Sequence, residues 1–251
     1  MTSATELSTT IDNAAAQLQG STPQEILTWA LNHYQKIALA SSFGAEDVVL
    51  IDMMAKIRPD AHIFTLDTGR LHEETYAVIA KVQQKYPQLN LQIMFPQADA
   101  VQEMVSSKGV NLFYDSVENR KQCCFVRKVE PLGRATAGLD AWITGLRRDQ
   151  TANRSTMQPV ELDADRQIAK INPLIDWSYD QVWEYIKAND VPYNVLHDRD
   201  FPSIGCAPCT RAIAKGEDLR AGRWWWEMSN QECGLHVTND GRLVRAKDAV
   251  S

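Results

Sequence analysis

Short apolar runs alternate with longer amphipathic stretches along most of this sequence. The first run, Lys36 to Ala40, has the length of a buried strand, and Val48 to Ile57 is apolar nearly all round, as in a helix packed against a sheet. The polar stretch 153–164 is predicted to be a flexible loop. Further strands are predicted at residues 62–66, 91–95, 141–144 and 170–174, and further helices at 22–35, 71–86, 98–108, 116–134 and 178–186.

Strands that alternate with helices indicate a parallel sheet covered on both faces. We therefore predict an α/β fold with a doubly wound, mostly parallel sheet. In such folds ligands bind outside the carboxyl ends of the strands. Two unusual loops, which begin at Ser41 and at Asp67, fall at that edge.

The two ends of the chain depart from this alternation. Thr22-Pro23-Gln24-Glu25 has the capping residue, proline and glutamate of a helix start, so residues 1–21 are predicted to be flexible or a short helix. Regular periodicity fades from Val191 onward. We predict an α/β domain over residues 22–190 and a C-terminal segment over 191–251 that packs on it.

Charge and composition disfavour several classes of protein. The chain has 251 residues and a formal net charge of -6, which disfavours broad nucleic-acid binding because such binding needs a positive surface. No window is long and apolar enough to cross a bilayer, and the N-terminus has no basic patch or apolar run of a targeting signal. We expect a soluble, cytoplasmic protein. The sequence leaves open whether it forms a homo-oligomer.

Four of the five cysteines form two pairs, Cys123-Cys124 and Cys206-Ala-Pro-Cys209. The cytosol keeps thiols reduced, so the pairs indicate metal ligation or catalysis rather than disulfides. Adjacent thiolates tend to point apart, which suits a [4Fe-4S] cluster, where each reaches its own iron, better than a single zinc ion. Zinc and unligated core cysteines stay open as alternatives, because a thiol also packs as a small hydrophobe.

The fifth cysteine, Cys233, stands apart from these pairs. Its neighbours Glu232, Gly234 and His236 do not form a core pattern. A nearby arginine or protonated histidine would favour the thiolate, which is the nucleophilic form. Cys233 is therefore a candidate nucleophile, and a non-catalytic packed or surface cysteine is the alternative.

The loop from Ser41 to Asp47 joins a predicted strand to a predicted helix and contains Gly44. Backbone N–H groups at a helix start are unpaired and carry partial positive charge, so a bound phosphate is stabilised there. The loop has neither the lysine of a Walker loop nor a dinucleotide fingerprint. An ordinary strand-to-helix turn is the alternative.

Basic residues gather beside these segments in a chain that is acidic overall. Guanidinium groups grip phosphate or sulfate through two hydrogen bonds, which favours an anionic small-molecule ligand over the alternative of solvated surface arginines. Trp224-Trp225-Trp226 is more typical of packing than of a ligand platform. The basic residues are Arg127, Lys128, Arg147, Arg148, Arg154, Arg211, Arg220 and Arg223.

Taken together, the motifs resemble the iron-sulfur type of assimilatory adenylyl-sulfate reductase, over a stretch from about Lys36 to His236. The resemblance implies a nucleotide-binding fold like that of the adenine nucleotide α-hydrolases and a [4Fe-4S] cluster. It also implies reduction of adenosine 5′-phosphosulfate to sulfite and AMP, in sulfate assimilation towards cysteine biosynthesis. The motifs are Ser42-Phe-Gly-Ala-Glu-Asp47, Leu66-Asp-Thr-Gly-Arg70, Lys121-Gln-Cys-Cys124 with Arg127-Lys128, Gly205-Cys-Ala-Pro-Cys209, Gly222-Arg-Trp-Trp-Trp-Glu227 and Glu232-Cys-Gly-Leu-His236.

The resemblance also assigns roles to residues. Cys233 would attack the sulfate sulfur and form an S-sulfocysteine, which a separate thioredoxin or glutaredoxin would reduce, because this chain ends soon after His236. The thiol and an external dithiol supply the two electrons, so the cluster is expected to act by structure and electrostatics, with Lys128 as its link to the sulfate. The cluster ligands would be Cys123, Cys124, Cys206 and Cys209. Substrate-binding roles would fall on Ser41, Ser42, Phe43, Gly44 and Asp47 at the nucleotide end, Leu66 and Gly145 at the adenosine, Arg154 at the phosphate, and Lys128, Arg220, Arg223 and His236 at the sulfate.

Several alternatives stay open beside this resemblance. The family often has serine where this chain has Phe43, and Arg147 and Arg148 could face either substrate or solvent. The rival substrate is 3′-phosphoadenylyl sulfate, used alone or as well, although the four additional cysteines favour the unphosphorylated compound. A different chemistry is an ATP-activating reaction such as tRNA thiolation. The non-enzyme alternative is a zinc protein that binds an adenine nucleotide.

Overall fold

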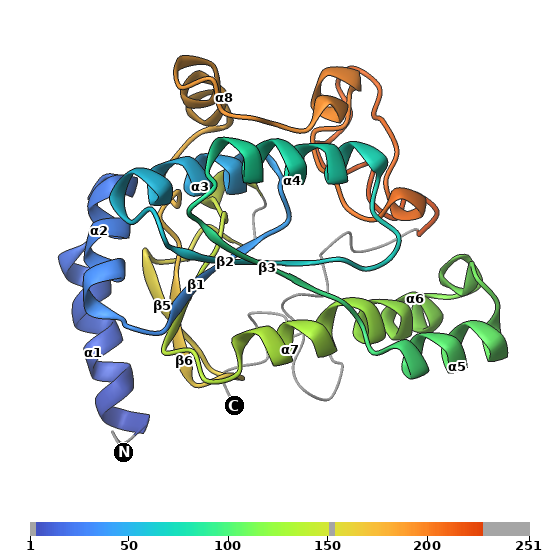
Figure 1. Cartoon of the computed structure of the whole chain (residues 1–251), viewed down its shortest axis with the longest axis horizontal. Coiled ribbons are helices and arrows are strands. Elements are labelled where there is room, and N and C mark those ends of the chain that lie inside the picture. Colours follow the sequence, from blue (N-terminus) through green and yellow to red (C-terminus); the bar gives the residue numbers. More distant parts are fainter. Residues whose placement is uncertain (1–3, 151–153, 228–251) are drawn as a thin grey trace. The chain divides into compact units, whose positions relative to one another are not determined.

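The computed structural model, which describes residues 4–150 and 154–227, contains a six-stranded sheet (Figure 1). The strand order is β3-β2-β1-β4-β6-β5. β1 runs parallel to both β2 and β4, β4 runs parallel to β6, and the edge strand β5 pairs antiparallel with β6. The predicted α/β class with a mostly parallel sheet is therefore confirmed. The strands are β1 (Ile37–Ser41), β2 (His62–Leu66), β3 (Asn90–Met94), β4 (Ala141–Ile143), β5 (Val160–Asp163) and β6 (Ile168–Ile171).

The helices follow the strands in the predicted alternation. α2 begins with the expected capping box, in which the Thr22 backbone N–H donates to Glu25 Oε2 at 2.7 Å and the Glu25 N–H donates to Thr22 Oγ1 at 3.3 Å. No helix of the described residues combines the length and apolar character that crossing a membrane requires. The helices are α1 (Ala4–Gln17), α2 (Pro23–His33), α3 (Ala45–Ile57), α4 (Glu73–Lys85), α5 (Ala98–Lys108), α6 (Val117–Cys124), α7 (Glu130–Thr136) and α8 (Tyr179–Ala188).

Two local predictions need correction, at 153–164 and 116–134, and at the N-terminus the structure has the helical alternative. The predicted flexible loop 153–164 contains β5, because Val160 is buried and Glu161 pairs across the ladder with Lys170, which offsets the polarity of the stretch. The N-terminal residues form the 14-residue helix α1, held by buried Ile11, Ala14 and Leu18. The predicted helix 116–134 is interrupted by a π-helical turn at Phe125–Val129, between α6 and α7.

The chain forms two compact units, each with a core of its own. In the first, residues such as Leu27, Leu39, Val48 and Ile143 are fully buried, and burial of each contributes about 1.5–3 kcal/mol. In the second, Met104, Leu112 and Phe113 cluster with Cys206, Cys209 and Trp224. Among the described residues, the first unit comprises 4–65, 78–92, 136–150 and 154–193, and the second comprises 66–77, 93–135 and 194–227.

Candidate functional site

The loop between β1 and α3 is closed by Asp47. Both the backbone N–H and the hydroxyl of Ser42 donate to Asp47 Oδ2, at 2.6 and 2.8 Å. Phe43 adopts a left-handed φ of 58°, and its N–H donates to Ser41 Oγ at 3.1 Å. Phe43 is 1% exposed, so its side chain belongs to the core of the first unit. Gly44 is the N-cap of α3 and supplies no side-chain cap, which leaves the first N–H groups of the helix suited to an anion.

Asp47 is buried beneath this loop beside Gly145. Burial raises the pKa of the Asp47 carboxyl to about 6, although the hydrogen bonds from Ser42 act in the opposite direction. A Cβ atom on Gly145 would lie 2.4 Å from Asp47 Oδ1. This distance is too short for a non-bonded contact, so Asp47 would have to move. The structure thus brings Ser41, Ser42, Asp47 and Gly145 together.

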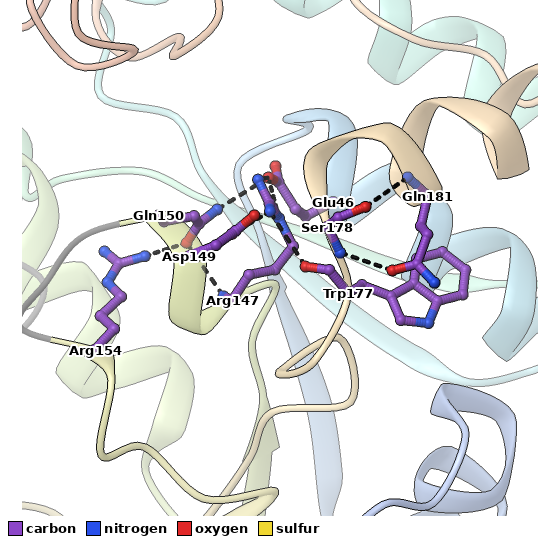
Figure 2. Close-up of polar contacts among 8 residues, drawn as sticks. All are labelled: Glu46, Arg147, Asp149, Gln150, Arg154, Trp177, Ser178 and Gln181. Carbon is purple, nitrogen blue, oxygen red and sulfur yellow. Dashed lines mark hydrogen bonds and ion pairs between the residues drawn. The ribbon is translucent and has the colours of Figure 1, made fainter.

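Arg147 and Arg148 are both held by protein groups. Arg147 is 2% exposed, and its guanidinium contacts Glu46 at 3.0 Å, donates to the Trp177 carbonyl at 3.3 Å and pairs with Asp149 (Figure 2). Arg148 pairs with Asp176 and donates to the Met157 carbonyl at 2.9 Å. Arg147 is therefore a structural element of the loop rather than a solvent-facing charge.

Gln150 is a residue of this region that sequence reasoning missed. Its amide nitrogen donates to Glu46 Oε1 at 2.9 Å, and its amide oxygen accepts from Arg154 Nη1 (Figure 2). The contact with Glu46 joins residues 104 positions apart in the chain, so no local pattern signals it. Arg154 itself is 8% exposed, which is consistent with a role inside a binding site rather than at the solvated surface.

The four paired cysteines line one pocket of the second unit, which we call the cysteine pocket. Cys123 and Cys124 come from the end of α6, and Cys206 and Cys209 flank a short 3₁₀ turn at Ala207–Cys209. All four are free thiols. In the described residues, no three histidine, cysteine or acidic side chains are arranged as ligands of a single metal ion. The pocket lining consists of Arg70, Phe113, Arg120, Cys123, Cys124, Arg127, Lys128, Cys206, Pro208 and Cys209.

The loop after β2 holds the cysteine pocket in place. Thr68 Oγ1 lies 3.2 Å from Cys206 Sγ, and the Ala207 N–H donates to the Arg70 carbonyl at 2.8 Å. The π-helical turn turns Arg127 inward, where its Nη1 donates to the Thr68 carbonyl at 2.6 Å. The Asp67 loop, singled out in the sequence as a ligand loop, therefore also supports the second cysteine pair.

The cysteine pocket combines buried thiols with four basic side chains, Arg70, Arg120, Arg127 and Lys128. Burial, followed by the neighbouring sulfur of Cys206, raises the pKa of the Cys209 thiol to about 12. Burial also raises the pKa of Cys123, against the influence of Arg127. Burial thus favours the neutral thiol at Cys123 and Cys209, whereas thiolates bound to metal would be balanced by the four basic side chains in the pocket lining.

Arg223 is the best-packed of the arginines predicted to bind sulfate. It is 5% exposed, lies over the Trp224 ring at 5.0 Å and donates to Ser203 Oγ at 3.2 Å. Gly205 permits this packing, because a Cβ there would lie 2.4 Å from Arg223 Nη2. Trp224 is 1% exposed and Trp226 packs on Tyr114, which confirms the packing interpretation for these two tryptophans.

The remaining predicted residues are placed as follows. Leu66 is the last residue of β2 and is partly exposed, and Arg220 lies in the turn before Arg223, also partly exposed. Lys128 lines the cysteine pocket, as its predicted link to the metal site requires. Cys233 and His236 lie outside the described residues.

Comparison with known proteins gives a consistent set of matches. The model of the phosphoadenosine phosphosulfate reductase domain matches residues 36–212. Adenosine 5′-phosphosulfate reductase of Neisseria meningitidis serogroup B is 53% identical over 198 residues, covering 78% of this chain and 80% of the relative. The Burkholderia cepacia protein of the same name is 52% identical over 206 residues, 82% of each chain. The crystal structure of phosphoadenylyl-sulfate reductase from Candida auris, a phosphate complex, has a TM-score of 0.71 at 33% identity and covers 80% of this chain and 96% of that chain.

Proposed function

The chain belongs to the phosphoadenosine phosphosulfate reductase domain family, and from this membership we propose that it reduces adenosine 5′-phosphosulfate to sulfite and AMP. It is an oxidoreductase that acts on a sulfur group. The observation that carries the choice of substrate is the identity above 50%, over about four fifths of the chain, to proteins named adenosine 5′-phosphosulfate reductase.

We propose a two-step reaction through Cys233. The Cys233 thiolate attacks the sulfate sulfur, an S–S bond forms, the bond from sulfur to the AMP oxygen breaks, and AMP leaves. A thiolate of thioredoxin or glutaredoxin then attacks Cys233 Sγ and expels sulfite. The second thiol of that dithiol resolves the mixed disulfide, so the two electrons come from the dithiol. A thiol nucleophile explains why a solitary cysteine accompanies the four that line the pocket.

The proposed nucleotide-binding residues have separate roles. The start of α3, with Ser42 and Gly44, offers N–H groups to an anion, and Arg154 is the proposed phosphate ligand. Gly145 and Leu66 would contact the adenosine. Lys128, Arg220, Arg223 and His236 are the proposed sulfate ligands, and their positive charge would stabilise the negative charge that develops on the leaving AMP oxygen.

We propose that the four cysteines of the pocket hold a [4Fe-4S] cluster. Two features support the fit: four thiols share one pocket, and Arg70, Arg120 and Arg127 line it beside Lys128. When bound, the cluster would supply structural order and an electrostatic field to the sulfate site, because the dithiol already accounts for both electrons. Lys128 is placed to respond to that field.

Product release tests the function directly. The protein, purified anaerobically, is supplied with adenosine 5′-phosphosulfate and reduced thioredoxin, and sulfite is measured. Without the reductant, intact mass should show one added sulfonate on Cys233. The family name and the Candida auris structure also favour the 3′-phosphorylated substrate as a second candidate, so both compounds are compared at equal concentration. Faster sulfite release from the 3′-phosphorylated compound would reverse the choice of substrate.

The cellular setting follows from the chemistry. A reaction that needs a free thiol and a reduced dithiol suits the cytoplasm, which keeps thiols reduced. Its product, sulfite, would feed the assimilation of sulfate towards cysteine biosynthesis. Both statements are part of the proposal.

A further inference from the structure

Gln150 lies between the first turn of α3 and Arg154 (Figure 2). Its amide nitrogen donates to Glu46 Oε1 at 2.9 Å, and its amide oxygen accepts from Arg154 Nη1 and from the Arg147 backbone N–H, the latter at 3.2 Å. We propose that Gln150 is a positioning residue, which sets the direction of the Arg154 guanidinium for the phosphate of the bound nucleotide. This inference rests on the proposed function, which assigns the phosphate to Arg154.

The neighbours of Gln150 permit only one orientation of its amide. The Glu46 carboxylate can only accept hydrogen bonds and the Arg154 guanidinium can only donate them. A reversed amide would place N–H groups against N–H groups at Arg154 and oxygen against oxygen at Glu46. The Gln150 oxygen is therefore directed at Arg154, and one edge of the guanidinium is fixed before substrate binds.

Glu46 is itself held firmly, so the orientation of Gln150 depends on buried structure. Glu46 accepts from Arg147 at 3.0 Å, and Arg147 is 2% exposed and donates to the Trp177 carbonyl at 3.3 Å. Trp177 directly precedes Ser178, which caps α8 in a capping box with Gln181 (Figure 2). A continuous set of contacts thus runs from the cap of α8 to Arg154. Such pre-organisation lowers the entropy that a long arginine side chain loses on binding.

A neutral amide suits this position better than a carboxylate. A carboxylate at residue 150 would still accept from Arg154, but it would neutralise the charge that the phosphate needs and would face Glu46 at hydrogen-bond distance. An amide oxygen orients the guanidinium and leaves its charge intact. The proposal therefore predicts that a substitution that removes the hydrogen bond to Arg154 and a substitution that places a negative charge beside Arg154 have different effects.

The test measures AMP binding by titration calorimetry, together with KM and kcat for adenosine 5′-phosphosulfate, on the cluster-loaded enzyme. Gln150→Met keeps the shape and removes all three side-chain hydrogen bonds, to Glu46, Arg154 and the Arg147 backbone N–H. We expect about a tenfold rise in the AMP Kd and in KM, the effect of losing a hydrogen bond to a charged group, with kcat changed about twofold or less. Gln158→Met is the matched control, because Gln158 is exposed and its amide contacts only the carbonyl of Thr156.

Exchanging the side chains at positions 46 and 150 distinguishes a positioning role of Gln150 from an effect on the stability of the fold. Gln150→Glu alone should lower the Tm and weaken AMP binding. Adding Glu46→Gln restores a donor and an acceptor between residues 46 and 150, so the Tm should recover in part, because buried Arg147 then lacks the Glu46 charge, while the AMP Kd stays raised because a carboxylate still contacts Arg154. Recovery of both quantities together would mean that Gln150 acts only through stability, and would overturn the positioning role.

The outcomes also separate this inference from the proposed function. An enzyme that releases sulfite normally, with an unchanged AMP Kd and KM in Gln150→Met, overturns the positioning role and leaves the proposed function standing. An enzyme that releases no sulfite, yet loses AMP affinity in Gln150→Met, supports the positioning role and contradicts the proposed function.

Discussion

Asp47 and Gly145 approach so closely that a methyl group on Gly145 would lie 2.4 Å from Asp47 Oδ1. Asp47 in turn accepts two hydrogen bonds from Ser42, so the absence of a side chain at Gly145 determines where the loop after β1 can lie. Gly145 comes soon after β4 and Asp47 lies in α3. Because Gly145 has no side chain, the segment that follows β4 can pack directly against the start of α3.

Gly145→Ala should damage both stability and nucleotide binding. The new methyl group must displace Asp47 or Glu46, and overpacking of this kind costs about 1–3 kcal/mol. Because Asp47 holds Ser42, AMP binding should weaken as well. Urea unfolding gives the loss of stability, and calorimetry gives the AMP Kd.

Gly133→Ala provides the matched control for this substitution. Gly133 lies in α7, and a Cβ there would have no atom within 4 Å. Alanine should therefore stabilise that helix by about 1 kcal/mol and leave AMP binding unchanged. A Gly145→Ala protein that matches the wild type in both measurements would show that the loop tolerates the methyl group.

The buried carboxyl of Asp47 predicts a pH dependence of stability. Its pKa is raised by burial to about 6, above its ordinary value of 3.8, so between these values the folded protein holds a proton that the unfolded chain has released. Stability from this group is present at low pH and is lost as the pH rises from about 4 to about 6, by about 3 kcal/mol in all. Asp47→Asn removes this titration.

The difference in the free energy of unfolding between the wild type and Asp47→Asn separates the titration of Asp47 from that of other groups. Urea unfolding at pH values from 4 to 8 should show the wild type losing stability relative to the variant up to about pH 6, with a constant difference above it. A difference that does not change with pH would mean that Asp47 is ionised in the folded protein throughout.

The sequence predicted the parts of the fold that depend on local pattern. The apolar run of β1, the all-round apolar α3 and the capping box at Thr22 are each recognisable within a few residues, because burial and capping impose fixed spacings. β6 lies at Ile168–Ile171 rather than 170–174, an ordinary boundary error. β5 was missed because its alternation of apolar and acidic residues is short and its stability comes from pairing with β6.

The residues of the candidate site also differ in how far the sequence alone predicts them. The cysteine pairs and the loop from Ser41 to Asp47 carry signals in their residue types, and the structure brings each set together. Gln150 carries no such signal, since glutamine is common on surfaces and its partner Glu46 lies 104 residues away. The two orientations left open for Arg147 could be decided only by its burial against Glu46 and Trp177.

A buried ion pair in the second unit predicts a large effect on stability. Arg120 and Glu227 have side chains 3% and 5% exposed and are joined at 2.5 and 3.0 Å, and Arg120 also lies over the Trp224 ring at 4.6 Å. Arg120→Met leaves the Glu227 carboxylate buried without its partner, which should cost about 3–5 kcal/mol in urea unfolding. Adding Glu227→Gln removes the stranded charge and should recover part of that loss. If the double variant is no more stable than Arg120→Met alone, the cost comes from lost packing on Trp224 instead.

The cysteines have two proposed roles, four as cluster ligands and Cys233 as the nucleophile, and substitutions in the two groups should have different effects. Cys206→Ala and Cys209→Ala each remove one of the four proposed cluster ligands, so iron and acid-labile sulfide should fall and the broad absorption at the violet end that the proposed cluster would give should disappear. The Tm should fall as well, because bound metal stabilises the folded state. Cys233→Ser is the matched control: it should keep the iron and bind AMP, yet release no sulfite, because serine cannot replace the thiolate as nucleophile. Full iron content in a Cys206→Ala, Cys209→Ala double variant would contradict the assignment of the cluster ligands, and sulfite release by Cys233→Ser would contradict that of the nucleophile.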